Sequence, residues 1–287
     1  MAQRIADIFL EREEQTLSPY AFLTKNTRGR DHPYVPCENR TEFQRDRDRI
    51  LHSKSFRRLM HKTQVFLSPE GDHYRTRMTH TLEVSRIART ICRALRLNED
   101  LAEAAAYGHD LGHTPFGHAG ERALDQIHPG GFAHYKQSVR VVEVLEKNGN
   151  GLNLTWEVRN GIMNHRTSGN PSTLEGQVVR FSDKIAYIHH DMDDAQRAGI
   201  ITEDDIPVTM RTFLGYTTRE RLNTFVHNII ENSMDKDSIS MSPDVFEAMM
   251  ELRALMFRNV YENPVAKKEE DKAIKMLSEL YEYYTDH

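Results

Sequence analysis

Apolar residues recur every three or four positions along most of this chain, and the alternation of apolar and polar residues that marks strands is almost absent. Such spacing gives a helix one apolar face, so the pattern predicts a mainly α-helical protein. Helices are expected over residues 41–62, 74–97, 99–109, 118–127, 137–147, 156–165, 172–198, 218–232, 243–262 and 266–284. The expected fold class is therefore all-α.

The same pattern divides the chain into three parts. Residues 1–40 are expected to be an irregular lead-in, because helix-breaking residues gather in its second half, namely Pro19, Gly29, Pro33 and Pro36. Residues 41–204 carry the strongest helical patterns and are expected to form the main core. Residues 205–287 are expected to form a smaller helical part packed on that core.

Polar side chains interrupt the apolar stripes of three expected helices. His80 stands at the head of the stripe of one helix, and His109 and Asp110 lie at the C-terminal end of the next. A capping box, Ser172-x-x-Glu175, is expected to start a third helix. In that helix three residues at intervals of four share a second face: Asp183, Tyr187 and Asp191.

Metal-site or acid/base chemistry is indicated by the stretch from Tyr107 to His118, which holds three imidazoles and a carboxylate. With His80 upstream and Asp183 downstream, His109 and Asp110 make a set of two imidazoles and two carboxylates. Such a set suits a divalent cation such as Mn, Mg, Fe, Co, Ni or Zn. It leaves coordination positions open for water and substrate, as catalysis requires.

Composition narrows the class of protein. The chain is 38% hydrophobic and 28% charged with a net charge of −5, which favours a globular protein over a general nucleic-acid coat. Two cysteines, Cys37 and Cys92, show no ligand-like spacing and favour a reducing compartment. With no signal-peptide or membrane-spanning run, we expect a cytoplasmic protein without a membrane partner. Residues 40–62 hold eight basic and three acidic residues, which indicates either a solvated helix face or a polyanionic ligand.

The chain resembles the His-Asp (HD) phosphohydrolase superfamily, whose metal ligands follow the pattern H…HD…D, matched here by His80, His109, Asp110 and Asp183. Longer stretches are similar to the bacterial deoxyguanosinetriphosphate triphosphohydrolase-like proteins: FRRLMHKTQVF (56–66), PEGDHYRTR (69–77) and HDLGHTPFGHAGE (109–121). Related SAM-and-HD-domain dNTP hydrolases share the same core. The resemblance covers residues 17–287 and implies an HD-domain helical bundle with a helical C-terminal extension.

The resemblance implies metal-dependent hydrolysis of a dNTP, such as dGTP, to deoxynucleoside and intact triphosphate, with water attacking the α-phosphorus. A bound cation would lower the pKa of that water and polarise the phosphate. The leaving 5′-oxygen needs a proton donor, and His118 matches the family's catalytic histidine. Glu121, three residues later on the same helical face, would orient His118, and His134 matches a further active-site histidine.

Substrate contacts are also implied by the resemblance. Arg77 and Lys184 match triphosphate-binding positions, where a guanidinium or an ammonium group binds phosphate oxygens. His113 follows the ligand pair His109 and Asp110 closely enough along the chain to contact phosphate or base. Three residues match positions near the deoxyribose: Gln64, Tyr187 and Asp191.

Three functions fit these residues to different degrees. The first is a dNTP triphosphohydrolase, which the run of basic residues favours because its substrate carries several charges. The second is another HD hydrolysis, of a deoxynucleoside monophosphate or a cyclic nucleotide. The third is a regulator that binds nucleotide or single-stranded DNA. The expected partners are a dNTP substrate, a regulatory dNTP, single-stranded DNA and further copies of the chain in a dimer, tetramer or hexamer.

Overall fold

The computed structural model describes residues 4–64, 75–261 and 264–287. Within these ranges the chain folds into helices joined by loops. Two isolated β-bridges, Arg30–Thr155 and Thr63–Thr76, are the extended pairings found there, and neither grows into a strand. The all-α fold class is thus confirmed. In the same ranges, every helix is too short or too polar to cross a lipid bilayer.

The α-helices follow one another along the chain as α1 (Ile5–Thr16), α2 (Glu42–Leu51), α3 (Lys54–Arg58), α4 (Arg77–Leu95), α5 (Glu99–Gly108), α6 (Gly117–Ile127), α7 (His134–Arg140), α8 (Glu146–Gly149), α9 (Trp156–Asn164), α10 (Leu174–Arg197), α11 (Val208–Leu214), α12 (Thr218–Ser233), α13 (Pro243–Met256) and α14 (Pro264–Asp286). Short 3-10 or π-helical turns are interspersed as η1 (Thr24–Asn26), η2 (Leu59–His61), η3 (Val141–Leu145), η4 (Glu203–Asp205) and η5 (Phe257–Tyr261).

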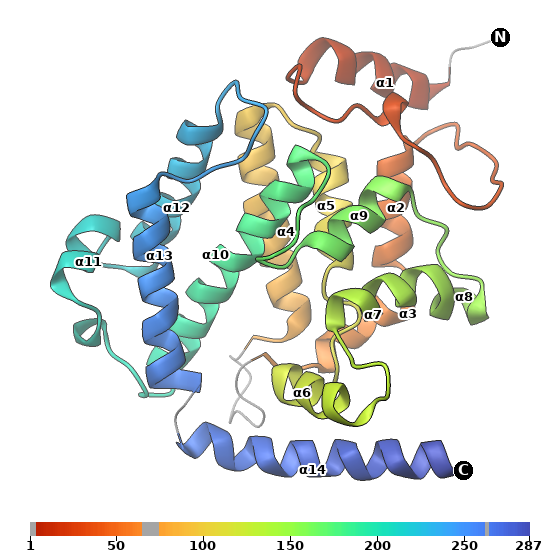
Figure 1. The fold of residues 1–287 in the computed structure, drawn as a ribbon. Coiled ribbons are helices and arrows are strands. Elements are labelled where there is room, and N and C mark those ends of the chain that lie inside the picture. Colours follow the sequence, from red (N-terminus) through yellow and green to blue (C-terminus); the bar gives the residue numbers. More distant parts are fainter. Residues whose placement is uncertain (1–3, 65–74, 262–263) are drawn as a thin grey trace.

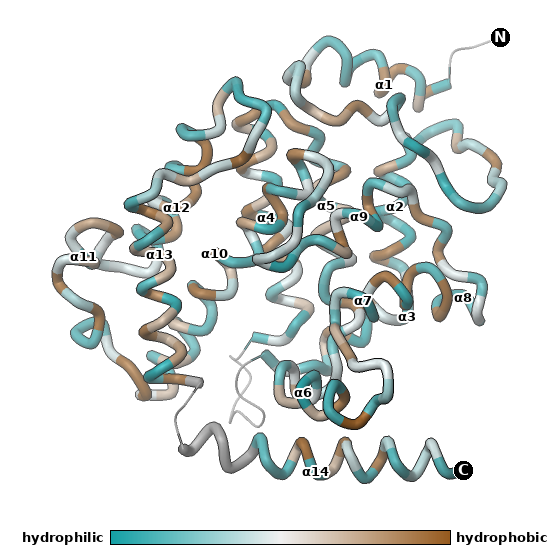
Figure 2. The backbone as a smooth tube through the Cα atoms, in the orientation of Figure 1, coloured by the Kyte–Doolittle hydropathy of each residue, from teal (hydrophilic) through white to brown (hydrophobic). Residues whose placement is uncertain are grey.

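Three helices, α4, α5 and α10, form the centre of the molecule, with α2 and α9 on one side and α12 and α13 on the other (Figure 1). Apolar and polar stretches alternate along single helices, for example along α13 and the coloured part of α14 (Figure 2). The expected apolar stripe of α4 is buried, as are those of α5 and α10: Val84, Ile87, Ile91 and Leu95, then Leu101 and Ala105, then Val178, Phe181, Ile185, Ile188 and Met192. The central helices are therefore fixed by core packing on several sides.

The N-terminal half differs from the expectation in two places. The segment 1–40 was expected to be irregular throughout, but residues 5–16 form α1. The single helix expected over 41–62 is broken at His52 and Ser53, because the Ser53 hydroxyl accepts the backbone N–H of Phe56 and starts α3. A serine at that position competes with helix continuation by capping a new one.

The start of α10 also differs from the expectation. Thr173, not Ser172, caps the helix by accepting the backbone N–H of Gly176. The hydroxyl of Ser172 donates instead to the Asn160 side chain. Glu175 turns away from the helix end and accepts the backbone N–H groups of Asn98 and Phe22. The predicted capping box was therefore wrong, although α10 begins close to where it was placed.

Candidate active site

Four predicted ligands converge from the three central helices. His80 lies in the first turn of α4, His109 caps the C-terminus of α5 with Asp110 after it, and Asp183 lies in the middle of α10. Oδ1 of Asp183 is 3.1 Å from His80 Nε2 and 3.6 Å from His109 Nε2. Oδ1 of Asp110 is 3.4 Å from His109 Nε2. Residues separated by a hundred positions thus meet at one point.

The donor atoms at this point suit a cation. Nδ1 of His109 donates to the Ala106 carbonyl at 2.6 Å, which leaves a lone pair on Nε2. That Nε2 is buried and has no hydrogen-bond partner among the described residues. Ligand atoms of His80, His109 and Asp110 all lie within 4.8 Å of one another. A buried nitrogen lone pair beside two carboxylates fits a divalent metal ion.

Electrostatics at this point favour charged carboxylates. Burial opposes ionisation of Asp110, but the neighbouring His109, His113 and Arg77 hold the pKa of Asp110 well below its usual range. Burial likewise opposes ionisation of Asp183, whose pKa is lowered by the neighbouring imidazoles of His109 and His80. Burial alone would lower the pKa of His109, but the two carboxylates raise it to about 9, so a bound cation would displace a proton from Nε2. The protein therefore presents anionic ligands to a cation.

A tight loop connects this cluster to α6. Gly112 lies so close to α7 that a Cβ there would come within 2.1 Å of the Ser138 backbone nitrogen. The Ser138 hydroxyl accepts the Gly112 N–H at 2.9 Å and donates to the His109 carbonyl at 2.7 Å. From the other side, Lys62 donates to the carbonyls of Leu111 and His113. Burial, followed by the charge of Arg77, lowers the pKa of Lys62 to about 8.

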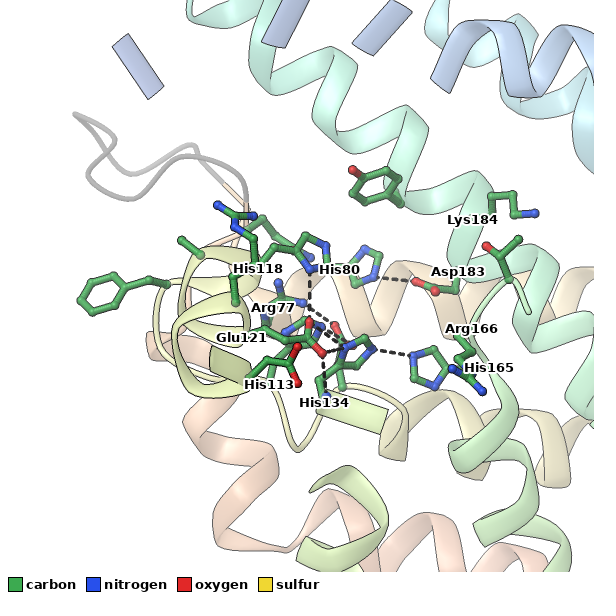
Figure 3. Close-up of a pocket in the computed structure, with 18 of the residues that line it drawn as sticks. Arg77, His80, His113, His118, Glu121, His134, His165, Arg166, Asp183 and Lys184 are labelled. Carbon is green, nitrogen blue, oxygen red and sulfur yellow. Dashed lines mark hydrogen bonds and ion pairs between the residues drawn. The ribbon is translucent and has the colours of Figure 1, made fainter. Parts of the chain in front are cut away.

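At the far end of the loop, α6 carries His118 and Glu121. Nδ1 of His118 is 3.4 Å from Glu121 Oε2, and the His118 side chain is 56% exposed. Glu121 also accepts from His134, which starts α7, at 2.8 Å from both the backbone N–H and Nδ1. Burial opposes ionisation of Glu121, but hydrogen bonds to the two histidines lower its pKa. One carboxylate therefore serves two imidazoles (Figure 3).

Behind His134 lies a further imidazole, His165, directly after α9. Its Nδ1 donates to the Ile162 carbonyl at 2.8 Å, and its Nε2 is 3.2 Å from His134 Nε2. Burial and the neighbouring His109 lower the pKa of His165 to about 4. A neutral imidazole that donates from one nitrogen accepts at the other, so His165 accepts from His134. His134 is thus placed between two acceptors.

Many of these side chains line one cavity of about 790 Å³. Glu121 and His118 line it from α6, and Asp183 and Lys184 from α10 on the opposite side (Figure 3). The lining also includes six basic side chains, those of Arg77, Arg122, Arg166, Arg180, Lys184 and Arg253. Arg77 also binds Asp110, with Nη1 2.8 Å from Oδ2. The cavity thus combines a cation site, a histidine cluster and a positive wall, which suits a polyphosphate.

The structure brings most of the predicted site residues to this cavity, including Gln64, His113 and Tyr187. His109 is fully buried just behind the lining. Asp191 is also buried, 2% exposed, but does not line the cavity, so its predicted contact with a sugar stays a prediction.

The sequence reasoning missed several lining residues. The expectation gave no site role to His165, Arg166, Arg180 or Arg253. One of them had a usable signal, because Arg180 precedes Lys184 by four residues and so shares its helical face. His165 had none, since its partners come from α5 and α7.

Family comparisons agree with this geometry. A model of the HD domain matches residues 77–188, and a model of the phosphohydrolase-associated domain matches residues 239–287. A protein of Caldanaerobacter subterraneus is 57% identical over 99% of this chain and 84% of its own length. One from Desulfatibacillum aliphaticivorans is 50% identical over 99% of this chain and 84% of its own. One from Clostridium perfringens is 50% identical over 95% and 82%. All three are named deoxyguanosinetriphosphate triphosphohydrolase-like proteins.

Among solved structures, the fold is similar to that of a hypothetical protein from Aquifex aeolicus, with a TM-score of 0.54 and 22% identity. The match covers 82% of this chain and 60% of the other. At this identity the likeness concerns the fold alone.

Proposed function

This chain belongs to the deoxyguanosinetriphosphate triphosphohydrolase-like family of HD-domain proteins, and on that premise we propose that it hydrolyses deoxynucleoside triphosphates to deoxynucleoside and triphosphate. One observation carries the proposal: the buried, unpartnered Nε2 of His109 lies with two carboxylates beside a cavity walled by basic residues. That combination suits a cation-dependent reaction on a substrate with several phosphates.

The residues that would hold the cation are His80, His109, Asp110 and Asp183. When bound, a divalent ion such as Mn²⁺ or Mg²⁺ supplies Lewis acidity toward a phosphate oxygen and lowers the pKa of water. Two imidazole nitrogens and carboxylate oxygens are donors that several first-row metals accept. The identity of the ion is therefore left to the assay below.

Basic residues on opposite walls would bind the triphosphate. Lys184 follows the ligand Asp183 directly on α10, and Arg77 precedes His80 by one turn on α4. Burial lowers the pKa of Lys184, and a phosphate group beside it would offset this effect by favouring the charged ammonium form. Arg166, Arg180 and Arg253 extend the positive wall. Phosphates bound along this wall would present the α-phosphorus to the cation site.

Proton transfer would be the role of His118. Attack of water forms an O–P bond at the α-phosphorus and breaks the bond to the 5′-oxygen, which must gain a proton to leave as deoxynucleoside. His118 lines the cavity from α6. Glu121 beside it stays ionised and can accept a hydrogen bond from the His118 imidazole. His134 contacts Glu121 through Nδ1 and His165 through Nε2, which would fix the orientation of its ring next to phosphate oxygens.

Sugar recognition would involve Gln64 and Tyr187, which line the cavity, and Asp191 further along α10.

We also propose residues 41–204 as the phosphohydrolase core and 205–287 as the part packed on it. A regulatory dNTP, single-stranded DNA, a homo-oligomer and a cytoplasmic location complete the proposal. Each of these follows from the family likeness and the composition.

The test is a product assay. The purified protein is incubated with each dNTP, and with an equimolar mixture, in the presence of Mn²⁺, Mg²⁺, Co²⁺, Ni²⁺, Fe²⁺ or Zn²⁺, and the products are resolved by ion-exchange chromatography. We expect tripolyphosphate and deoxynucleoside in equal amounts. Inorganic phosphate in place of tripolyphosphate, or no product from any dNTP, would contradict the proposal. The mixture also reports activation by a second nucleotide.

A further inference from the structure

A second pair of residues, His190 on α10 and Glu83 on α4, lies behind the ligand His80. Neither was assigned a role from the sequence. We propose that His190 and Glu83 are positioning residues that hold His80 in the one tautomer and orientation in which its Nε2 can bind the catalytic cation. The inference rests on the proposed function, because it concerns the same cation site.

The contacts run in one line from α4 across to α10 and back. Nε2 of His80 faces Asp183, and Nδ1 of His80 lies 3.2 Å from Nδ1 of His190. The two rings meet edge to face, with an interplanar angle of 87°. On its other side, His190 Nε2 contacts Oε2 of Glu83. His80 and His190 are each about 2–3% exposed, so water does not compete for these nitrogens.

The donors and acceptors available determine which nitrogen donates in each contact between Glu83, His190 and His80. The contact between Glu83 Oε2 and His190 Nε2 lacks hydrogen-bond geometry, so it is the negative charge of Glu83 that favours the His190 tautomer with its proton on Nε2. A neutral imidazole has one donor, so His190 Nδ1 is an acceptor and His80 Nδ1 must donate to it. Without a cation, the Asp183 carboxylate 3.1 Å away accepts from His80 Nε2. A bound cation would replace that proton, and donation from Nδ1 to His190 then leaves Nε2 the lone pair that a metal ligand requires.

The opposite direction is unfavourable. If His80 carried its proton on Nε2, Nδ1 of His190 would have to donate, and a neutral His190 would turn a lone pair on Nε2 toward the Glu83 carboxylate. A second proton on His190 would avoid this repulsion only by burying a cation. The charge on Glu83 therefore selects the tautomer of a histidine it does not touch.

Glu83 is itself held in place. Arg75 Nε lies 3.3 Å from Glu83 Oε2, and Arg75 Nη1 lies 2.7 Å from Asp193 and 3.0 Å from Asp194 on α10. The second ligand histidine, His109, has its Nδ1 proton fixed by the Ala106 carbonyl of its own helix. Side-chain substitution cannot remove a carbonyl, so the two ligands respond differently to mutation.

The experiment measures cation binding directly. The dissociation constant for Mn²⁺ is determined by titration calorimetry, and the visible spectrum of the Co²⁺ protein is recorded, for wild type and for His190→Leu, His190→Asn and Glu83→Gln. Loss of outer partners weakens metal binding by about 10- to 100-fold, and we expect this for His190→Leu, with an altered Co²⁺ spectrum. His190→Asn keeps an oxygen acceptor near Nδ1 and should recover part of the affinity.

His189→Leu is the matched control, because it alters the adjacent half-buried residue of the same helix. We expect wild-type Mn²⁺ affinity for it. If His190→Leu does not fold, Glu83→Gln gives the same readout from a side chain that is 41% exposed. Wild-type affinity in His190→Leu, or in Glu83→Gln where His190→Leu does not fold, together with an unchanged Co²⁺ spectrum, would overturn the inference.

The two proposals fail in different ways. Weaker Mn²⁺ binding in the variants, without release of triphosphate by the wild-type protein, would support the positioning role and contradict the proposed reaction. Triphosphate release with unchanged Mn²⁺ affinity in every variant would do the reverse. Thermal unfolding of each variant separates a loss of fold from a loss of tautomer control.

Discussion

Single hydrogen bonds decide what each imidazole of this site can do. His109 and His165 are fixed by carbonyls of their own helices, whereas His80 depends on His190. His118 differs from all of them, because its side chain is mostly exposed and its carboxylate partner is 3.4 Å away. A loosely held, accessible imidazole is suited to deliver a proton to a substrate atom.

This difference predicts the effect of His118→Ala. We expect kcat for dNTP hydrolysis to fall by about 10²- to 10⁴-fold, the usual contribution of a positioned acid. The Mn²⁺ dissociation constant and the unfolding temperature should stay at their wild-type values, because His118 is exposed and touches no cation ligand in the set. Steady-state kinetics with calorimetry checks both. A large loss of Mn²⁺ affinity would instead indicate a ligand role.

At this scale the sequence predicted what lies within one motif. The pair His109 and Asp110 was recognisable because the two residues are adjacent, and His118 with Glu121 because they share a helical face. His165 and His190 were missed because their partners are 31 and 110 positions away. No local sequence pattern identifies a histidine whose role is to accept a hydrogen bond from a residue on another helix.

Helix ends, more than helix interiors, determine how the elements are placed. The beginning of α10 is tied to the beginning of α5 and to Phe22 by Glu175, whose Oε1 accepts two backbone N–H groups at 2.9 and 3.0 Å. Burial raises the pKa of Glu175 to about 7 in spite of these donors. At a pH between these two pKa values, 4.5 and about 7, this carboxyl group is protonated in the folded state and ionised in the unfolded chain.

The shift predicts a pH dependence with a definite sign. Between the ordinary glutamate pKa of 4.5 and the folded-state pKa of about 7, the folded protein binds the additional proton, so the free energy of unfolding of the wild type should fall as pH rises. Relative to Glu175→Gln, which mimics the protonated group, the fall should be on the order of 1 kcal/mol per pH unit and level off above the folded pKa. Urea unfolding at pH 5, 6, 7 and 8 measures it. A difference that is constant from pH 5 to 7 would contradict the prediction.

Element boundaries were less predictable than element existence. Apolar spacing located every helix that carries a cation ligand, because core burial sets that spacing. It did not resolve the break at Ser53 or the choice of Thr173 over Ser172, because hydroxyls at neighbouring positions compete to cap a helix. α1 and α11 were not predicted at all.

On the scale of the whole molecule, the cation ligands join three helices that also form the centre of the fold. Two carboxylates, of Asp110 and Asp183, and two buried imidazoles meet there, so a bound cation would stabilise the native state but not the unfolded chain. Ligand binding of this kind raises the free energy of unfolding in proportion to the logarithm of the ligand concentration.

We therefore expect Mn²⁺ at one hundred times its dissociation constant to raise the free energy of unfolding by about 2.7 kcal/mol. Thermal unfolding with and without the ion measures this, and EDTA should reverse it. Asp183→Asn, an isosteric change in the ligand set, serves as the control and should lose most of the effect. An equal stabilisation of wild type and Asp183→Asn would place the ion elsewhere.

Two different parts of the fold carry the cation ligands and the proposed proton donor. The cation ligands belong to the packed centre, whereas α6, with His118 and Glu121, packs chiefly against α14. Local opening of α6 and α14 would therefore require less free energy than global unfolding. Amide hydrogens of α6 should exchange sooner than those of α5, and on warming, turnover should vanish while Mn²⁺ is still bound. In that state the protein would still bind the cation but would no longer hold the proton donor His118 in place.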